Sequence, residues 1–555
     1  MIGRYMRPEM GSIWSEAAQY ASWLEVEVAA AEAMAALGHI PAEALDDVRR
    51  AVPPDPERVA EIERRTGHDV IAFLEAIEEQ IGSGARYLHL GLTSSDVLDT
   101  SLALRCRRAS DLLIAGCDAL VELFLAKALE YRDQPMVGRT HGIHAEPITL
   151  GLKFLRYYEE FRRAADRLRR AREVVRFGQI SGAVGSYGTL DPAVEPRTCA
   201  ELGLNVEPVS SQVVPRDRHA EFLSHLAVVA ASIENVALEI RGLQRTEVLE
   251  AAEPFGKGQK GSSVMPHKRN PIKCENLVGL ARLVRAYAMT GFENVALWHE
   301  RDISHSSVER VAIADACIAL DFMQHRLYAI IDGLDVYPEA MERNLNLTNG
   351  LVFSSRVLEA LLHAGLARTE AYRLVQRASM TCWETGESLK ALLAADAEVM
   401  ARLSAEDLDE AFDITAALSG VEAVYERILG ADGAGAEDNR RGAPRRKGER
   451  RQSERRDEER RSRGDRRYDA DEEEHEDPDR RERGDRRDED ERRDESERRD
   501  ESRRSDSDRR SRTDRRGSGD RRDETDRRVA SDDSFEDDDR RSGDRRTRPR
   551  RGADG

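Results

Sequence analysis

Apolar positions recur at three- and four-residue intervals along most of residues 1–430, which is the pattern of amphipathic helices and not of alternating strands. The clearest example follows Asp217, where one series with a seven-residue period runs through Leu226, Ile233 and Ile240. A second series with the same period runs through Val229, Val236 and Leu243. Together they predict a helix of about nine turns with partners along its whole length.

Three further stretches show the same helical period. They follow Asp99, Pro147 and the pair Asn270-Pro271, where Asn is a favourable N-cap and Pro a favourable first helical residue. The apolar faces of these helices are too extended for one chain to cover, so we expect several copies of the chain to share one bundle. The predicted fold is all-α, with a long-helix bundle as its core.

Polar, glycine-rich stretches interrupt the helical pattern and are the expected sites of chemistry. They are residues 90–96, 137–146, 182–191 and 255–271. We expect a small helical domain over 1–92, a central long-helix bundle over 93–345 and a second small helical domain over 346–430.

The composition changes abruptly after residue 430. Residues 431–555 hold 41 basic and 43 acidic side chains, two aromatic residues and four copies of Gly-Asp-Arg-Arg. Because so little apolar surface cannot offset the entropy of ordering, we expect a disordered, low-complexity tail. Its nearly balanced charge favours a solvating role over an RNA- or partner-binding arm, and the sequence identifies no partner for it.

The remaining 430 residues carry 46 basic and 63 acidic side chains. This acidic balance argues against sequence-independent nucleic-acid binding, so a negatively charged ligand needs a local cluster of cations. The six cysteines are scattered without a CxxC pair, the N-terminus lacks an apolar signal core, and no run approaches the ~20 apolar residues of a membrane span. We expect a cytoplasmic protein without disulfides and without a membrane.

The most informative segment is residues 258–275, GQKGSSVMPHKRNPIKCE. A Gly-Ser-Ser loop precedes Lys268 and Asn270, which lie just before a predicted helix. The ammonium group, the amide and the helix N-terminus can converge on a carboxylate while a loop hydroxyl reaches over it. On residue types alone, an exposed surface loop is an equally good interpretation.

The sequence GSSVMPHKRNP resembles the signature loop of the fumarase/aspartase superfamily, whose members eliminate fumarate or a relative of it from a succinyl group. Within that superfamily, the stretches RYMRPEM, THGIHAEP, SSQVVPRD and WHERDISHSSVER are similar to the adenylosuccinate lyase family. The resemblance spans residues 1–430 and none of the tail. It implies a fumarase/aspartase-like fold and a homotetramer whose active sites are assembled from three chains.

The resemblance also implies a small-molecule nucleotide substrate and a role in purine synthesis. The implied reactions release fumarate from adenylosuccinate and from the related succinyl-carboxamide ribotide, SAICAR. Another lyase of the superfamily, such as argininosuccinate lyase, shares the signature loop but not the other four stretches. A non-catalytic helical scaffold that works through its tail is disfavoured, because every main catalytic position is occupied.

The implied chemistry removes a weakly acidic proton beside a carboxylate, which requires a positioned base and strong stabilisation of the aci-carboxylate that forms. Lys268 and Asn270 suit that stabilisation. The resemblance implies that Ser262 is the base, activated by closure of the loop, and that His141 protonates the leaving nitrogen. Ser263 is the rival base, and taken alone His141 is more often a structural histidine.

Further roles are implied for residues scattered along the chain. The phosphate of the nucleotide is assigned to Arg4, Tyr5, Arg301, Ser306 and Arg310. Other substrate contacts are assigned to His68, Asp69, His89, Thr93, Ser94 and Gln212, and Glu275 is assigned to orient a histidine. Taken singly, each arginine is more often a surface charge, Thr93 and Ser94 can also cap the following helix, and Glu275 can be a solvated first-turn residue. Ser306 and Arg310 share a face if their segment is helical.

One position departs from the family pattern, because Gly67 stands where the family commonly has Arg before the His-Asp pair. Arg64 or Arg65 is the expected substitute for that cation. His141 and His144 are three residues apart on a predicted loop, and no carboxylate-histidine cluster has ligand spacing. We therefore expect neither a metal nor an organic cofactor.

Overall fold

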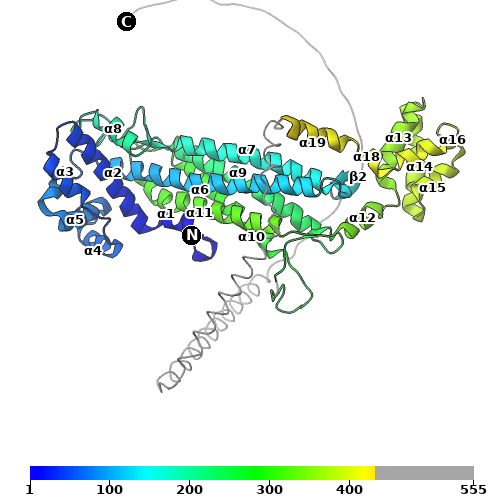
Figure 1. The fold of residues 1–555 in the computed structure, drawn as a ribbon, viewed down its shortest axis with the longest axis horizontal. Coiled ribbons are helices and arrows are strands. Elements are labelled where there is room, and N and C mark those ends of the chain that lie inside the picture. Colours follow the sequence, from blue (N-terminus) through cyan, green and yellow to red (C-terminus); the bar gives the residue numbers. More distant parts are fainter. Residues whose placement is uncertain (257, 432–555) are drawn as a thin grey trace, which may run out of the picture. The chain divides into compact units, whose positions relative to one another are not determined.

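The structure is a computed structural model, and it describes residues 1–256 and 258–431 (Figure 1). Helices dominate this part of the chain, and its strands form three two-stranded sheets. The all-α prediction is therefore confirmed. The predicted disordered tail lies outside the described residues, apart from Ala431 at the end of the last helix.

Five long helices of the described part form the central bundle: α6 (Ser94–Glu130), α7 (Leu150–Val174), α9 (Asp217–Leu243), α10 (Ile272–Glu293) and α11 (Ser304–Asp332). Helix α9 packs along α7, α10 and α11, while α6 packs along α7 and α11. Both apolar series predicted for α9 are buried in this bundle. The helix has 27 residues, about seven and a half turns and not the predicted nine, because the chain leaves it at Gln244.

Smaller elements flank the bundle in sequence. The N-terminal ones are η1 (Gly3–Tyr5), α1 (Pro8–Trp14), α2 (Glu16–Ala36), α3 (Ala42–Arg49), α4 (Pro56–Thr66), α5 (Asp69–Ile81) and η2 (Gly82–Tyr87). The C-terminal ones are α12 (Pro338–Asn346), η3 (Leu351–Phe353), α13 (Ser354–His363), α14 (Arg368–Thr385), α15 (Leu389–Ala395), α16 (Ala397–Met400), α17 (Ala405–Ala411), α18 (Ile414–Ala417) and α19 (Gly420–Ala431). Between bundle helices lie α8 (Val194–Glu201), β3 (Phe177–Gly178), β4 (Asn205–Val206) and β5 (Ala251–Ala252), and β6 (Asp335–Val336) follows α11.

Helix α9 meets the length and hydropathy of a membrane span, with a mean hydropathy of 1.4 over its most apolar window. The expectation that no run approaches such a span was therefore too strict. Half of this window is buried inside the chain, and three other bundle helices pack against α9. These contacts are those of a core helix, whose apolar side chains face protein.

The starts of two bundle helices differ from the prediction. Helix α6 begins at Ser94 because Thr93 and Asp96 form a capping box, in which the Thr93 N–H donates to Asp96 Oδ2 at 2.8 Å. Helix α10 begins at Ile272, and Asn270 is not its N-cap, because its side chain donates to the Gly261 carbonyl at 3.0 Å.

Residues 137–146 are not the loop that their polar sequence predicted. Strands β1 (Pro135–Thr140) and β2 (Ile143–Thr149) form an antiparallel hairpin over this region. Its two-residue turn is His141-Gly142, with φ of +55° and +80°, as a type I′ turn requires. The predicted catalytic residue His141 thus lies at the tip of a hairpin.

Buried apolar side chains form three main cores. One lies in the central bundle, one joins α2–α5 to the start of α6 and to residues 180–204, and one lies within α13–α17. The division at residue 92, which stays a proposal, is crossed by the second core, because Leu104, Ile180 and Cys199 belong to it. All six cysteines are buried free thiols.

Candidate active site

Nine of the predicted site residues gather around the N-terminal ends of α5, α6 and α11. They are His68, Asp69, His89, Thr93, Ser94, Gln212, Arg301, Ser306 and Arg310. Contacts between neighbouring segments link most of this group. We call it the α6-end group.

Helix α11 confirms that Ser306 and Arg310 share a face, since Arg310 Nε lies 3.5 Å from Ser306 Oγ. The Arg310 guanidinium also forms an ion pair with Asp69, the first residue of α5. His68 is the N-cap of α5, and its Nδ1 accepts the Ile71 N–H at 3.4 Å. The carboxylate of Asp69 thus compensates the positive charge of Arg310.

Gly67 has a structural reason in this chain. It ends α4 in the left-handed region, with φ of +65°, and its N–H donates to the Glu63 carbonyl at 2.8 Å. Gly adopts this conformation without the strain of about 1 kcal/mol that a side chain adds. Neither predicted substitute cation joins the α6-end group: Arg65 pairs with Glu75 on α5, and Arg64 is exposed on α4.

His89 is fixed by a buried carboxylate that the sequence did not single out. Glu27 on α2 is 1% exposed, and it accepts the His89 N–H at 2.8 Å and contacts His89 Nδ1 at 2.6 Å. Burial alone lowers the pKa of the imidazole. The hydrogen bond and charge of Glu27, with the charge of Asp96, outweigh burial and raise the pKa of His89.

Asp96 joins the start of α6 to the segment after β3. Its carboxylate is fully buried and accepts the N–H groups of Thr93 (2.8 Å), Ser181 (3.0 Å) and Gly182 (3.2 Å). Burial raises the pKa of Asp96 to about 6, although these hydrogen bonds and His89 oppose the shift. Thr93 is therefore a cap held in a fixed orientation.

The amide of Gln212 is oriented by contacts at both of its ends. Arg301 Nη1 donates to Gln212 Oε1 at 2.9 Å, and Gln212 Nε2 donates to the Ala183 carbonyl at 2.9 Å. Its backbone N–H donates to the Glu300 carbonyl at 3.2 Å. These hydrogen bonds connect Arg301, through Gln212, to the glycine-rich segment 182–191, whose first residue contacts Asp96.

A buried ion network lies beneath the α6-end group, and sequence reasoning missed all of it. Arg216 is 3% exposed and donates to Asp99 on α6 at 2.5 and 2.9 Å and to Glu309 on α11 at 3.0 and 3.1 Å. Burial raises the pKa of Glu309 to about 7. Burial and the charge of Arg216 lower the pKa of His219 to about 3 and that of His305 to about 4.

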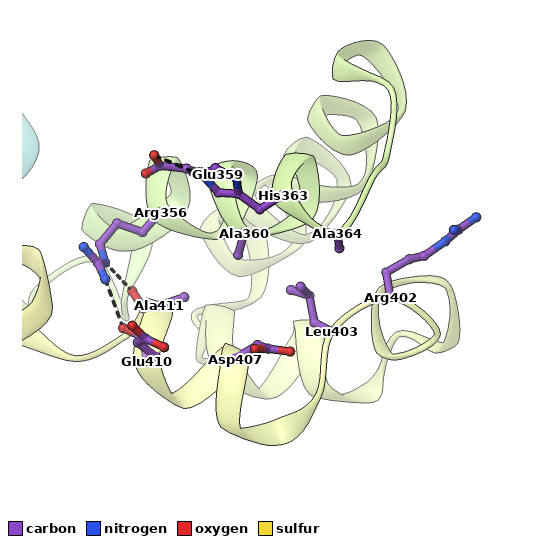
Figure 2. Close-up of a pocket in the computed structure, with 10 residues that line it drawn as sticks. All are labelled: Arg356, Glu359, Ala360, His363, Ala364, Arg402, Leu403, Asp407, Glu410 and Ala411. Carbon is purple, nitrogen blue, oxygen red and sulfur yellow. Dashed lines mark hydrogen bonds and ion pairs between the residues drawn. The ribbon is translucent and has the colours of Figure 1, made fainter.

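A cavity of about 300 Å³ opens above this network and is lined by Arg216, Arg301, His305, Ser306 and Arg310, among others. A larger cavity, of about 480 Å³, lies in the C-terminal helices and is lined by Arg356, Glu359, Ala360, His363, Ala364, Arg402, Leu403, Asp407, Glu410 and Ala411 (Figure 2). It contains none of the predicted site residues. The predicted site residues Arg301, Ser306 and Arg310 line the smaller cavity.

The signature loop is a second, separate group. Ser262 Oγ accepts the N–H groups of Val264 (3.3 Å) and Met265 (3.1 Å), so the hydroxyl caps its own turn. Ser263, Lys268 and the first-turn Glu275 are exposed. Among the described residues, no imidazole or ammonium group contacts the Ser262 hydroxyl.

His141 forms the third group and is exposed at the hairpin tip. The hairpin is anchored by Arg139, which donates to the fully buried Glu250 at 2.8 and 2.7 Å. Asn344 Nδ2 also donates to Glu250, at 2.9 Å. Burial and the charge of Arg139 lower the pKa of His144, which lies on β2 and not on a loop.

The long helices keep these groups apart within one chain. Thr93 lies at the start of α6, whose 37 residues span about 55 Å, and the hairpin with His141 follows its far end. Tyr5 packs its ring on Phe322, with centroids 5.4 Å apart. Phe322 lies 16 residues after Ser306 on α11, a rise of about 24 Å, so Arg4 and Tyr5 cannot share one phosphate with Ser306 inside one chain.

Comparisons with known proteins agree with this architecture. A family model described as Lyase matches residues 3–286, and one described as Adenylosuccinate lyase C-terminus matches residues 350–428. An adenylosuccinate lyase from Synechocystis sp. is 51% identical over 77% of this chain and all of that relative. One from Bacillus subtilis is 47% identical over 77% of this chain and 99% of that relative. The chain belongs to the adenylosuccinate lyase family.

Solved structures with the same fold include a fumarate lyase from Mesorhizobium sp., with a TM-score of 0.71 and 28% identity over 78% of this chain and 99% of that one. A 3-carboxy-cis,cis-muconate lactonizing enzyme from Pseudomonas putida has a TM-score of 0.70 and 31% identity over 76% of this chain and 96% of that one. The prediction of a lyase with a fumarase/aspartase-like fold is confirmed. The roles of individual residues stay predictions.

Adenylosuccinate lyase family membership does not by itself explain the buried residues that orient the α6-end group. A weak sequence signal existed for Glu27 and Asp99, which are acidic residues on otherwise apolar helix faces. Arg216 and Glu309 gave no such signal, because each has charged neighbours in sequence. Among residues 1–256 and 258–431, no group of three or more His, Cys, Asp or Glu side chains is arranged to hold a metal.

We expect Arg216→Met to destabilise the enzyme by about 3–5 kcal/mol, because it leaves the Asp99 and Glu309 carboxylates buried without a cation. Arg169→Met on α7 is the control, since Arg169 is 50% exposed and pairs at 2.7 Å with Asp118, which is 44% exposed. We expect the control to cost about 1 kcal/mol. Thermal unfolding of both variants measures the difference, and equal losses of Tm contradict the special importance of this network.

We expect Glu27→Gln to lower Tm more at pH 6 than at pH 9. Charged His89 is favoured in the folded state, so its contribution is present below the unfolded pKa of about 6.5 and is lost as pH rises through the raised folded pKa. Glu25→Gln on the same helix is the control, because its partner is the guanidinium of Arg108 and not an imidazole. A Glu27→Gln loss that is the same at both pH values excludes a charged His89.

Proposed function

We propose that this lyase eliminates fumarate from adenylosuccinate to give AMP, and from SAICAR to give AICAR, in purine nucleotide biosynthesis. The observation that carries the proposal is the cluster of Arg301, Ser306 and Arg310 beside one cavity, in a chain about half identical to relatives named adenylosuccinate lyase. Two arginines and a hydroxyl are suited to the phosphate of a nucleotide. Thr93, Ser94, His89 and Gln212 border the same region and supply further hydrogen-bonding groups.

Arg310 gives a physical route for phosphate binding. It is held by Asp69 in the structure, and a phosphate with a charge near −2 attracts the guanidinium more strongly than one carboxylate does. Among the described residues, Arg301 donates to the neutral Gln212 amide and forms no ion pair, so its charge can pair with an anion. Binding therefore exchanges an internal ion pair for one with the ligand.

The chemical step assigns Ser262 as the base and His141 as the acid. Ser262 takes the proton from the carbon beside the succinyl carboxylate, and the carbon–nitrogen bond then breaks with its electron pair leaving on nitrogen. His141 donates a proton to that nitrogen. Lys268 and Asn270 stabilise the negative charge on the aci-carboxylate intermediate.

The Ser262 hydroxyl accepts hydrogen bonds from its own loop, so the base requires a closed loop that brings it beside cations and excludes water. Val264 is 82% exposed on the open loop, which leaves room for that movement. Ser263 is the alternative base, and Glu275 is assigned to orient a histidine.

Because one chain keeps its three groups apart, the active site is proposed to form between chains of a homotetramer. Large apolar side chains that such an interface would cover are exposed on and between α10 and α11: Met289 (60%), Phe292 (53%), Trp298 (78%), Ile303 (67%) and Val311 (53%). We place the enzyme in the cytoplasm, where its nucleotide substrate is made. We propose neither a metal nor an organic cofactor for the reaction.

The purified full-length enzyme is expected to release fumarate from adenylosuccinate and from SAICAR, followed by the absorbance change of each substrate. Argininosuccinate is the matched negative control, because a related lyase of the superfamily acts on it. A variant that ends at residue 431 should retain nearly unchanged turnover. Turnover of argininosuccinate alone, or activity that depends on residues 432–555, contradicts the assignment.

A mixture of two inactive variants tests whether active sites are shared. Ser262→Ala and His141→Gln should each lower turnover by orders of magnitude while nucleotide still binds. When the two are unfolded together and refolded, random assembly should restore about a quarter of wild-type activity, since some sites then take both residues from intact copies. A mixture as inactive as its components shows that one chain supplies both groups.

A further inference from the structure

Arg326, in the second half of α11, is a partly buried arginine without a carboxylate partner. Its Nη1 donates to Asn276 Oδ1 on α10 at 2.5 Å, and its guanidinium lies over the Phe322 ring at 4.4 Å. Within residues 1–256 and 258–431 it forms no ion pair. Among the described residues, its hydrogen-bond acceptor is thus a neutral amide oxygen, which does not compensate the charge of a partly buried guanidinium.

A second cation lies beside Arg326. Tyr5 packs on the same Phe322 ring in an edge-to-face contact, and this places the 3-10 turn η1 against α11. Burial lowers the pKa of Arg326, and the positive charge of Arg4 lowers it further, although Tyr5 and Glu253 oppose the shift. Arg4 is exposed and also has no ion pair among the described residues.

The carboxylate of Glu253, whose charge acts on Arg326, forms its hydrogen bonds with other groups. Glu253 is 2% exposed and accepts the first N–H groups of α10, from Lys273 at 3.1 Å and from Cys274 at 2.9 Å. It therefore compensates the N-terminus of α10 and not Arg326. Asn276 lies one turn further along this helix, six residues after Asn270 of the signature loop.

Arg356 in the C-terminal helices shows how the same chain satisfies an arginine without a carboxylate. Its guanidinium donates to the carbonyls of Ala411 at 3.1 Å and Glu410 at 3.2 Å, at the end of α17 (Figure 2). Those carbonyls carry the negative end of a helix dipole. Within residues 1–256 and 258–431, Arg326 donates to no carbonyl at a helix end, so its charge is free to pair with an anionic ligand.

We propose that Arg326 binds an anionic group of the substrate, together with Arg4, beside the first turns of α10, the helix that follows the signature loop. This inference rests on the proposed function, because the succinyl nucleotide supplies the anion. The phosphate and a succinyl carboxylate share the chemistry that a guanidinium fork recognises.

Arg326→Met tests the proposal in the full-length enzyme. Loss of one charge-assisted contact is expected to raise KM for adenylosuccinate by about 10- to 100-fold, while Tm stays within a few degrees of the wild type. Arg326→Lys should give a smaller rise, because it keeps the charge and loses the fork. Arg356→Met is the matched control and should leave KM and kcat unchanged.

Inhibition by parts of the product identifies which anion is bound. AMP carries only the phosphate and fumarate only the carboxylates, so a contact to phosphate weakens inhibition by AMP in Arg326→Met, and a contact to carboxylate weakens inhibition by fumarate. Asn276→Asp offers Arg326 an internal counter-ion without removing its packing, and it should weaken the same inhibitor. Unchanged KM and unchanged inhibition by both compounds in Arg326→Met overturn the proposal.

The wild type in the same assay separates this inference from the proposed function. If the wild type does not release fumarate from adenylosuccinate, the proposed function fails and Arg326 is not the cause. If the wild type is active and Arg326→Met behaves like Arg356→Met, only the inference about Arg326 fails.

Discussion

The Arg216 guanidinium, buried between the Asp99 and Glu309 carboxylates, is the interaction on which the candidate site depends. Desolvating three charged groups is costly, and only close contacts in a fixed geometry offset that cost. Here those contacts connect α6, the start of α9 and α11, while Asp96 connects α6 to residues 181 and 182. The segments that carry Thr93, Gln212, Ser306 and Arg310 are therefore held together by polar contacts between elements.

Helix length imposes the second constraint. An α-helix is a rigid rod that rises about 1.5 Å per residue, so groups at opposite ends of α6 or α11 stay tens of ångströms apart whatever the loops do. A site that needs both His89 and His141 must therefore combine different copies of the chain. The exposed apolar side chains between α10 and α11 are the surface that such an association would remove from water.

Charge is distributed so that an acidic protein can hold an anion. Residues 1–430 are net acidic, which keeps the free surface repulsive to bulk anions, while a few arginines near the site lack strong internal partners. Arg301 is paired with an amide, Arg326 with an amide, and Arg310 with a single carboxylate. Under the proposed assignment, a phosphate or carboxylate of the ligand competes with these partners for the three guanidinium groups.

The sequence by itself determined the helical class, the buried seam of α9 and the signature loop, because heptad spacing and a ten-residue motif are local and survive without knowledge of contacts. The shared face of Ser306 and Arg310 followed for the same reason. Only the tertiary structure decided that residues 137–146 form a hairpin, since its turn requires two positive φ angles that a polar sequence does not announce. It also decided the partners of His89 and Arg326, because Glu27 and Asn276 are brought to them by packing across elements, and that of Asn270, because the signature loop folds back to place Gly261 beside it. Side-chain partners distant in sequence depend on how helices stack, and one chain's residue pattern carries no record of that stacking.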